Sequence, residues 1–439
     1  MDYKFNTDMV CECGKVHKTA VEDCLIESGA INKIPEFVKK YNATKAFIIG
    51  DVNTFPIAGD KIADILAKEG IPSTKFVFAA KRLIPDEKSM GSLILNYDAK
   101  CDFIIAIGSG VINDISKILA NIAKVPYMIV ASAAYMDGYA AGTSSMEVDG
   151  VKKTVNAKSP EIIIGDIDIL NGAPVHMAKS GLGDMLAKYI SICEWKIAHL
   201  IIDEYYCDRV AQFTIDSRDN CAKNAAGLLT RDPKAMEATF SGLIDCGRAM
   251  DYAGCSRPGG GVEHYYSHIW DMRGIDKGTK TAPHGTQAAL GTLYAIKAYK
   301  ELLNIVPNRE KALEYVKNFD YAAWSEELRE FVGKGAEAMI ALEAKEQKYD
   351  VEKHAARLEV ILAKWDEIRK IIEELPTVEE FEAILDSMEA PKSLAEVGMD
   401  DTVLGMTLKC TKDIRDKYVL SKLLWDLGVL DEICEKVYG

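Results

Sequence analysis

The segment GGGVEHYYSHIWDM, residues 259–272, places His264 and His268 four residues apart in a chain that holds seven histidines. On a helix, this spacing puts both imidazoles on one face, as in metal-binding pairs. Asp184 in SGLGDMLAK and His284 in TAPHGTQAALG also lie beside glycines, at points where helical patterns begin or are interrupted. Three such side chains can hold a divalent metal and leave a position for substrate. The alternative is a pair of packed, hydrogen-bonded histidines in an aromatic-rich helix.

A second set of metal-ligating residue types stands near the start of the chain, in CECGKVH. Cys11, Cys13 and His17 are three ligands, one short of a closed structural zinc site, and their spacing is unusual for one. The eleven cysteines are an odd number, scattered from Cys11 to Cys434. This distribution favours reduced thiols over a disulfide framework, and no zinc knuckle is predicted here.

A glycine-containing loop could cradle a phosphate. Residues 103–119, FIIAIGSGVINDISKIL, read as a buried strand that ends in Gly108-Ser109-Gly110 and is followed by a helix. Small residues let the backbone approach a phosphate, and the helix N-terminus attracts it. The third glycine of the usual dinucleotide fingerprint is absent, so a tight strand-to-helix turn is the alternative. Asp51, at the end of KAFIIGD, adds support because an acidic residue after a strand can hold a ribose hydroxyl.

The elements that must position these residues change character along the chain. Between residues 45 and 170, short apolar runs alternate with helical patterns at 59–70 and 112–125. Runs of Ile, Val and Phe that are buried on both faces predict a doubly wound, Rossmann-like parallel sheet. The predicted strands are KAFIIGD (45–51), TKFVFAA (74–80), CDFIIAIGSG (101–110), YMIVASA (127–133) and EIIIGDIDIL (161–170).

From about residue 171, long helical patterns with few strand candidates predict an all-helical C-terminal domain. Segments 179–207 and 240–254 are apolar on more than one face and should be buried, whereas 352–375 carries charge on one side and should lie outside. Pro376 and then Thr377, followed by acidic residues, mark a helix start. We therefore predict a dinucleotide-binding α/β domain over residues 1–170 and a helical metal- and substrate-binding domain over residues 171–439.

Composition restricts the class of partner. The chain has 439 residues, 48% of them hydrophobic and 27% charged, with a net charge of −14. Basic and acidic residues are interleaved, which makes nucleic acid an unsuitable partner. No apolar run approaches the ~18 residues of a membrane span and no secretion signal opens the chain, so a cytoplasmic location is expected. A few local cations in a cleft still allow an anionic small substrate.

Several stretches together resemble the glycerol-1-phosphate dehydrogenases of the bacterial type, within the dehydroquinate synthase-like and iron-containing alcohol dehydrogenase superfamily. The resemblance covers nearly the whole chain, CECGKVH included, and the combination of SRP, EH, SH.WDM and HG is specific to this branch. The matching stretches are IGSGVINDISK, ASAAYMDGYAAGTSSM, SGLGDMLAKYISICEWKIAH, SRPGGGVEHYYSHIWDM, PHGTQAALGT and IRDKYVLSKLLWDLGVL.

The resemblance implies different roles for the two histidines of the opening segment. It assigns Asp184, His264 and His284 as ligands of one divalent metal, with zinc first and nickel or iron as alternatives. His268 is then expected to contact substrate or to support the metal site, with plain packing as the alternative.

The same resemblance implies NAD or NADP as cofactor and a phosphorylated small molecule as substrate. Asp137 in YMDGY matches an active-site aspartate between cofactor and substrate. The residues matching the cofactor-binding positions are Gly108, Ser109, Gly110, Asp114 and Ser132, and the position of Asp51 after a strand adds it to this set. A carboxylate at Asp51 would repel a ribose 2′-phosphate and so favours NAD.

The implied reaction is the reversible reduction of dihydroxyacetone phosphate to sn-glycerol 1-phosphate. Arg257, beside a glycine-rich turn, is the predicted phosphate ligand, with a salt bridge as the alternative. Ala131, Ser132, Tyr135 and Ala141 replace the proline, threonine and two serines usual in the family, so the substrate is less firmly predicted than the reaction class. A related polyol dehydrogenase, a dehydroquinate synthase-like enzyme and a non-catalytic nucleotide-binding protein remain alternatives, and a homo-oligomer stays open.

Overall fold

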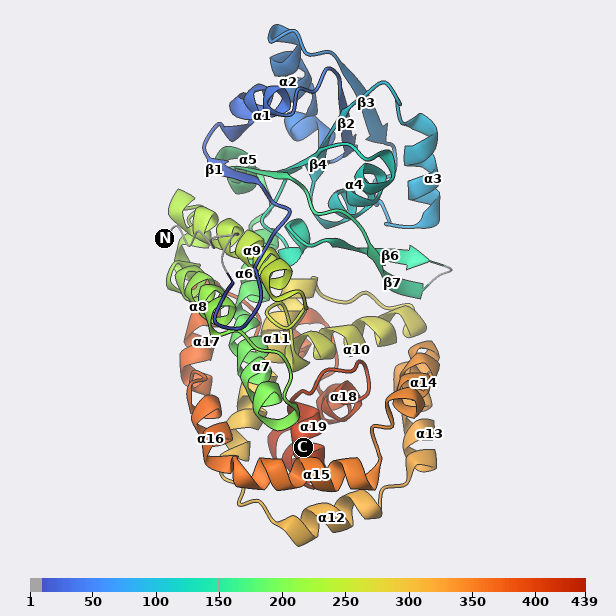
Figure 1. The fold of residues 1–439 in the computed structure, drawn as a ribbon, viewed down its shortest axis with the longest axis vertical. Helices are drawn as coiled ribbons and strands as arrows, with labels where there is room; N and C mark the ends of the chain where they lie inside the picture. Colours follow the sequence, from blue (N-terminus) through green and yellow to red (C-terminus); the bar gives the residue numbers. More distant parts are fainter. Residues whose placement is uncertain (1–9, 149–150) are drawn as a thin grey trace. The chain divides into compact units, whose positions relative to one another are not determined.

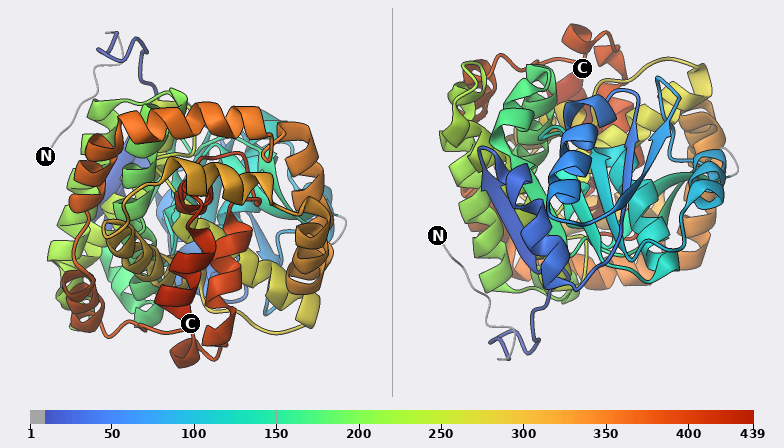
Figure 2. Two further views of the ribbon diagram at one scale, coloured as in Figure 1. Left: turned by 90° about the horizontal axis from the view of Figure 1, so that it is seen from below. Right: turned by 90° about the horizontal axis from the view of Figure 1, so that it is seen from above.

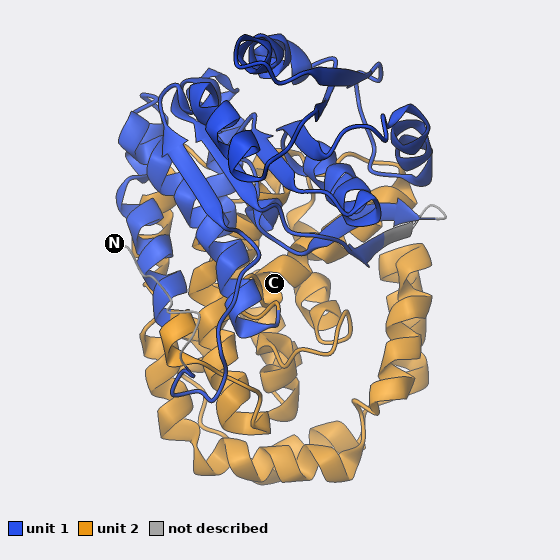
Figure 3. Ribbon diagram, turned by 45° about the horizontal axis from the view of Figure 1, so that its top comes forward, with its two compact units in different colours: residues 1–185, 212–255 blue, residues 186–211, 256–439 orange. Residues whose placement is uncertain are grey.

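The computed structural model describes residues 10–148 and 151–439 (Figure 1). Contacts divide the chain into unit 1, Met1–Met185 with Gln212–Cys255, and unit 2, Leu186–Ala211 with Ser256–Gly439 (Figure 3). Two of the three internal boundaries fall inside helices, α6 (Val175–Leu186) and α8 (Asp208–Lys223), and the third follows Cys255. The sequence predicts a boundary between residues 170 and 171 that separates a cofactor-binding domain from a metal- and substrate-binding domain. It stays a prediction, because the two units are defined by packing contacts and not by what they bind.

A parallel sheet forms the centre of unit 1. Its order is β1-β8-β5-β4-β2-β3, and every neighbouring pair runs parallel. A separate antiparallel pair joins β6 (Thr143–Val148) and β7 (Val151–Asn156). The strands of the main sheet are β1 (Asp23–Glu27), β2 (Ala46–Asp51), β3 (Ser73–Phe78), β4 (Phe103–Gly108), β5 (Tyr127–Ala131) and β8 (Ile162–Asp166).

Helices cover both faces of this sheet (Figure 2). One face packs with α1 (Ile34–Lys40) and α2 (Phe55–Lys68) in a single buried cluster, while α4 (Gly110–Ala123) packs on the strands from the opposite side. The remaining α-helices that lie wholly in unit 1 are α3 (Glu87–Asn96), α5 (Ile167–Gly172) and α9 (Pro233–Ala253). The predicted doubly wound α/β fold is confirmed.

The strand order creates a switch point between β2 and β4. From β2 the chain passes through α2 to β3 at one edge, and from β4 it passes through α4 towards β5 in the other direction. Ligands of such sheets bind beyond the carboxyl ends of the strands at this point. Asp51 ends β2 and Gly108 ends β4.

Every element of secondary structure described in unit 2 is a helix, which confirms the predicted C-terminal fold class. Its buried clusters include one built on Ile269, Trp324 and Leu328. The α-helices that lie wholly in it are α7 (Lys188–Ile202), α10 (Val262–Lys277), α11 (His284–Leu302), α12 (Arg309–Lys317), α13 (Tyr321–Val332), α14 (Ala336–Glu346), α15 (Val351–Ala363), α16 (Trp365–Glu373), α17 (Val378–Ser387), α18 (Leu404–Thr411), α19 (Leu420–Asp426) and α20 (Leu430–Tyr438).

The predicted helix start at Thr377 is confirmed in detail. Its hydroxyl accepts a hydrogen bond from Glu380 N, and the Glu380 carboxylate accepts one from Thr377 N, which is a capping box. Three strands were not predicted, the edge strand β1 and the paired strands β6 and β7. Within the described residues, no helix has both the length and the apolar character that crossing a membrane would need.

Candidate active site

Asp51 and the glycine loop lie at the carboxyl ends of neighbouring strands in unit 1. Asp51 Oδ1 accepts hydrogen bonds of 2.8 Å from both Asn53 N and Thr54 N, which fixes the carboxylate at the entrance to α2. Gly108 cannot be larger, because a Cβ there would lie 2.5 Å from the Ile112 side chain. This close approach brings the N-terminus of α4 against β4, as the tight-turn alternative requires, and it also directs backbone N–H groups beyond the strand end.

The first residues after β5 continue the same edge. Ser132 N donates to Gly108 O at 3.0 Å, so Ser132 lies beside the glycine loop and is 6% exposed. Ser109 is the N-cap residue of α4, although its side chain makes no capping bond, and Gly110 begins the helix. The structure therefore brings four predicted cofactor residues, Gly108, Ser109, Gly110 and Ser132, together at the adjoining ends of β4 and β5.

Asp114 lies one turn into α4 and is tied to a buried lysine that sequence reasoning missed. Lys117 is fully buried, and its Nζ donates to Gly138 O at 2.7 Å and to Thr143 O at 3.1 Å. Asp114 Oδ1 lies 3.7 Å from the same Nζ. Burial lowers the pKa of Lys117, although the Asp114 charge opposes this. Lys117 thus holds the loop that follows Asp137 against α4.

Asp137 and Asp184 meet within unit 1. Asp137 begins the short 3-10 helix Asp137–Tyr139, and its backbone N donates to Asp184 Oδ2 at 3.0 Å. The Cys246 thiol of α9 donates to Asp137 Oδ2 at 3.2 Å. Asp184 is completely buried in α6. A backbone bond of this kind orients one carboxylate oxygen of Asp184 and couples its position to that of Asp137.

A glycine makes this meeting of α6 and the loop after β5 possible. A Cβ at Gly181 would lie 2.3 Å from Ala134 O, which is a backbone atom that no side-chain rotation can move. Gly181 precedes Asp184 by three residues, so the two share one face of α6. The SGLGD sequence therefore combines the carboxylate with the small residue that its placement requires.

In unit 2, the histidine of the EH pair is oriented by its own neighbour. His264 Nδ1 lies 2.9 Å from Glu263 Oε1, an arrangement in which the imidazole N–H donates to the carboxylate. Glu263 is fully buried, and the same oxygen accepts a 2.6 Å hydrogen bond from Gly261 N. With Nδ1 engaged in this way, a metal would be bound through Nε2 of His264.

His284 opens α11 directly opposite this turn of α10. Its Nδ1 lies 3.2 Å from Ser267 Oγ, and the His264 and His284 ring centroids are 5.1 Å apart. The helices approach closely at Gly291, where a Cβ would lie 2.5 Å from Glu263 O. Both imidazoles are partly exposed, as ligands of a catalytic metal must be.

His268 lies beside these two histidines and makes ring contacts with His284 and Tyr265. Its ring is 6.2 Å from that of His284, in a stacked arrangement, and 6.4 Å from that of Tyr265. It is partly exposed and belongs to the same helix face as His264. The structure therefore places His264, His268 and His284 together in unit 2.

Arg257 is placed differently from its prediction. It is 1% exposed, and its guanidinium makes two hydrogen bonds to the Glu204 carboxylate, of 2.7 and 2.5 Å, and one of 3.0 Å to Tyr418 O. This geometry is the salt-bridge alternative, in a buried form. The phosphate contact stays a prediction, since these contacts engage three of the five N–H donors of the guanidinium.

A second buried lysine holds the glycine-rich turn before α10. Lys188 Nζ donates to Gly259 O at 2.5 Å, and Ser191 Oγ donates to Pro258 O at 3.0 Å. Both side chains lie on α7 and are fully buried. Sequence reasoning missed Lys188, although a lysine inside the apolar pattern of 179–207 is the kind of signal that marks a buried polar contact.

Comparisons with known proteins agree with this architecture. Residues 25–174 match the family described as iron-containing alcohol dehydrogenase. Among solved structures, the chain is similar to glycerol dehydrogenase from Schizosaccharomyces pombe, with a TM-score of 0.61 and 18% identity, covering 96% of this chain and 92% of that one. The iron-containing alcohol dehydrogenase of Thermococcus thioreducens gives a TM-score of 0.61 at 12% identity, covering 96% and 99%. These structural likenesses concern the fold.

Curated relatives are similar over most of their length. Glycerol-1-phosphate dehydrogenase [NAD(P)+] of Thermococcus sibiricus is 31% identical over 262 residues, which is 59% of this chain and 73% of that protein. The protein of the same name from Geobacillus thermodenitrificans is 25% identical over 393 residues, or 89% and 88% of the two chains. The similarity thus extends through both units.

Proposed function

We propose, from the premise that this chain belongs to the glycerol-1-phosphate dehydrogenase family, that it reversibly reduces dihydroxyacetone phosphate to sn-glycerol 1-phosphate. The chain is an NAD(P)-dependent oxidoreductase. The observation that carries the proposal is the oriented pair of imidazoles, His264 and His284. Each has its Nδ1 within hydrogen-bonding distance of a buried oxygen, so that each can bind a metal through Nε2.

Asp184, His264 and His284 are proposed to hold one divalent metal. One carboxylate and two imidazoles suit zinc, nickel or iron(II), and three protein ligands leave a position for substrate. When bound, the ion polarises the substrate carbonyl as a Lewis acid. The protein's own contribution is orientation: Glu263 sets the tautomer and direction of His264, and Asp137 N sets the direction of the Asp184 carboxylate.

The nicotinamide cofactor is proposed to bind at the switch point of the sheet and supplies the hydride. The α4 N-terminus, with Gly108, Ser109 and Gly110, would hold the pyrophosphate, and the Asp51 carboxylate would accept hydrogen bonds from ribose hydroxyls. Asp114 and Ser132 are proposed to complete the site. Because Asp51 carries a negative charge at this position, we propose NAD as the preferred form.

A proton must reach the substrate oxygen as the hydride arrives. Asp137 and His268 are the proposed carriers, with Asp137 also contacting a substrate hydroxyl. The Cys246 thiol donates to one oxygen of Asp137, which orients the carboxylate for that task. His268 is partly exposed, so it can exchange its proton with solvent between turnovers.

The test measures oxidation of NADH and of NADPH by the metal-loaded enzyme with dihydroxyacetone phosphate or unphosphorylated dihydroxyacetone. In the reverse direction it measures reduction of NAD⁺ and of NADP⁺ with glycerol. We expect turnover with the phosphorylated ketone and a product that an sn-glycerol-3-phosphate-specific enzyme does not oxidise. Preference for unphosphorylated substrates would replace the proposal with a glycerol dehydrogenase activity. Cofactor binding without turnover on any of these substrates would refute reduction of dihydroxyacetone phosphate.

A further inference from the structure

Residues 11–17 fold into a closed turn that gathers ligand atoms. Cys11 N donates to Lys15 O at 2.9 Å and Gly14 N donates to Cys11 O at 2.8 Å, with Gly14 at φ 84°, in the left-handed region that favours glycine. The turn brings Cys13 Sγ to 3.5 Å from His17 Nε2. A short loop that folds two cysteines back towards a histidine is a way to present several metal ligands from one segment.

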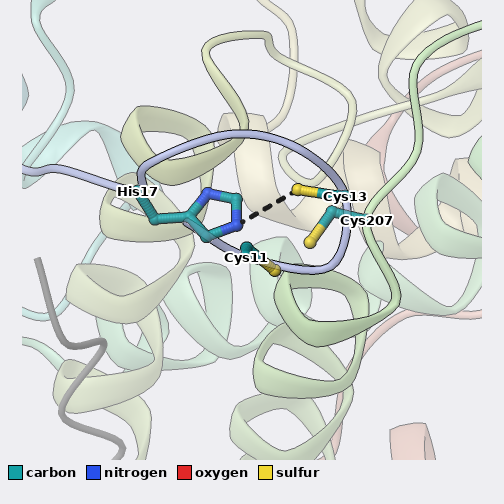
Figure 4. Close-up of side chains that lie close together, drawn as sticks. All are labelled: Cys11, Cys13, His17 and Cys207. Atoms are coloured by element: carbon teal, nitrogen blue, oxygen red, sulfur yellow. Dashed lines mark hydrogen bonds between the residues drawn. The ribbon is translucent and has the colours of Figure 1, made fainter. Parts of the chain in front are cut away.

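The fourth candidate ligand, Cys207, lies at the start of α8. Cys207 directly precedes this helix, and Ala211 N donates to Cys207 O at 2.9 Å, so the first turn is already helical. The helix continues unbroken into residues 212–223, which belong to unit 1 as the 11–17 turn does. One ligand atom each from Cys11, Cys13, His17 and Cys207 lies within 4.8 Å of the other three (Figure 4).

The histidine of this group is oriented for coordination. His17 Nδ1 lies 2.7 Å from Tyr252 O, and because a carbonyl can only accept, Nδ1 carries the proton. The other nitrogen, Nε2, is the one that faces Cys13. A backbone carbonyl on the far nitrogen is the arrangement that fixes tautomer and ring direction in histidines that bind metals. His17 is 3% exposed and Cys207 is 2% exposed, so both ligand atoms are shielded from solvent.

We propose that Cys11, Cys13, His17 and Cys207 bind one zinc ion in a closed, tetrahedral site. Zinc bonds of ~2.3 Å to sulfur and ~2.0 Å to nitrogen give tetrahedral edges of about 3.8 Å between sulfurs and about 3.5 Å from sulfur to nitrogen. The 3.5 Å between Cys13 Sγ and His17 Nε2 already has this length. The remaining edges reach it through small side-chain rotations from their separations of up to 4.8 Å.

The chemistry of this site differs from that of the proposed catalytic metal. Binding requires the three thiols to release their protons to solvent, so three thiolates, a neutral imidazole and Zn²⁺ carry a net charge of −1. Four protein ligands leave no position for substrate, which makes the ion structural. It would fasten the 11–17 turn to the start of α8, beside the end of α9, where Lys15 Nζ donates to Ala253 O.

The experiment uses the full-length protein with its metals replaced by Co²⁺. A thiolate-bound cobalt ion gives sulfur-to-metal charge-transfer absorption in the near ultraviolet, and Asp184, His264 and His284 contain no sulfur. We therefore expect this absorption in the wild-type protein, at one cobalt per chain beyond any bound by the three catalytic ligands. His264→Ala should keep it, so that failure of the proposed function leaves this readout unaffected.

Variants locate the ion. Cys207→Ser and Cys11→Ser should lose the charge-transfer band together with one equivalent of zinc in elemental analysis. Cys255→Ser, which changes a partly buried cysteine outside the group, should retain both. Cys207→His keeps four ligands and guards against simple unfolding: it should retain the metal with a weaker band. A folded wild-type protein without thiolate-to-cobalt absorption, or one in which two of these cysteines form a disulfide under reducing purification, overturns the proposal.

Discussion

Replacing Gly181 with alanine tests whether close approach of α6 to the loop after β5 positions the Asp184 carboxylate. The new Cβ would lie 2.3 Å from Ala134 O, whereas real Cβ contacts are not found under 3.0 Å, so the two backbones must separate by at least 0.7 Å. Neither partner is a flexible side-chain end. Overpacking of this kind costs about 1 to 3 kcal/mol of the free energy of unfolding, and a misplacement of this order at a reacting centre costs about 10²-fold in kcat/KM.

The same shift should weaken the 3.0 Å hydrogen bond from Asp137 N to Asp184 Oδ2. The assay combines the thermal midpoint, metal content by elemental analysis and steady-state kinetics. Gly172→Ala is the matched control, because a Cβ there would meet nothing within 4 Å. We expect Gly181→Ala to lose bound catalytic metal and activity while Gly172→Ala keeps both. A Gly181→Ala protein with wild-type metal content and kcat/KM would refute the reasoning, whatever its stability.

Three further predictions concern unit 2. His264→Ala should abolish both activity and metal binding at the catalytic site, since two remaining ligands hold a divalent ion poorly. His268→Ala should keep the metal and lose about 10- to 100-fold in turnover. The control is His176→Ala, which changes an exposed histidine on α6, and equal metal loss in the His264 and His268 variants would contradict the assignment. Arg257→Ala should lower the free energy of unfolding by about 3 kcal/mol, measured by denaturant titration, because it leaves Glu204 without its bidentate partner. A KM increase confined to phosphorylated substrates would instead indicate that Arg257 binds the substrate phosphate. Burial, and then the charge of Glu263, raise the pKa of Glu194 from 4.5 to about 8, so between these pH values the folded state holds a proton that the unfolded state has lost. The free energy of unfolding should therefore fall as the pH rises from 4.5 to about 8, by up to about 1.4 kcal/mol per pH unit. Glu194→Gln should flatten this slope in denaturant titrations, and an unchanged slope would mean that another group causes it.

The parts of the fold that the sequence predicted well are those whose pattern is local. Continuous apolar runs such as residues 103–108, short and rich in isoleucine, favour buried strands, and Thr377 with Glu380 is a complete capping signal within four residues. Strand β1 was missed because DCLIE is short, ends in charges and lies at the sheet edge, where burial is partial. The β6–β7 pair was missed because its residues are largely polar, which is the composition of a loop.

The candidate site shows the same division between local and distant signals. The glycine loop could be predicted from its own residues, whereas Ser132 was predicted only through the family resemblance; the structure places Ser132 beside Gly108 because neighbouring parallel strands end at one edge. Arg257 could not be assigned, because an arginine beside glycines looks the same whether it will meet a phosphate or a carboxylate 53 residues away. Its partner, Glu204, stands in the sequence IIDEYYC, which contains no feature that distinguishes an ion-paired glutamate from a solvated one.

Buried charged side chains are the part of this site that is hardest to predict from the sequence, and they position the loops that carry the predicted site residues. Lys117, Lys188 and Glu263 are fully buried, and each bonds to a backbone carbonyl or N–H of a loop beside a predicted site residue. A charge buried without partners is strongly destabilising, so each of these loops must close on its charge for the fold to form. The stability of the core and the geometry of the site therefore depend on the same contacts, which is why a pattern of polarity along the chain identifies candidate ligands but not the residues that aim them.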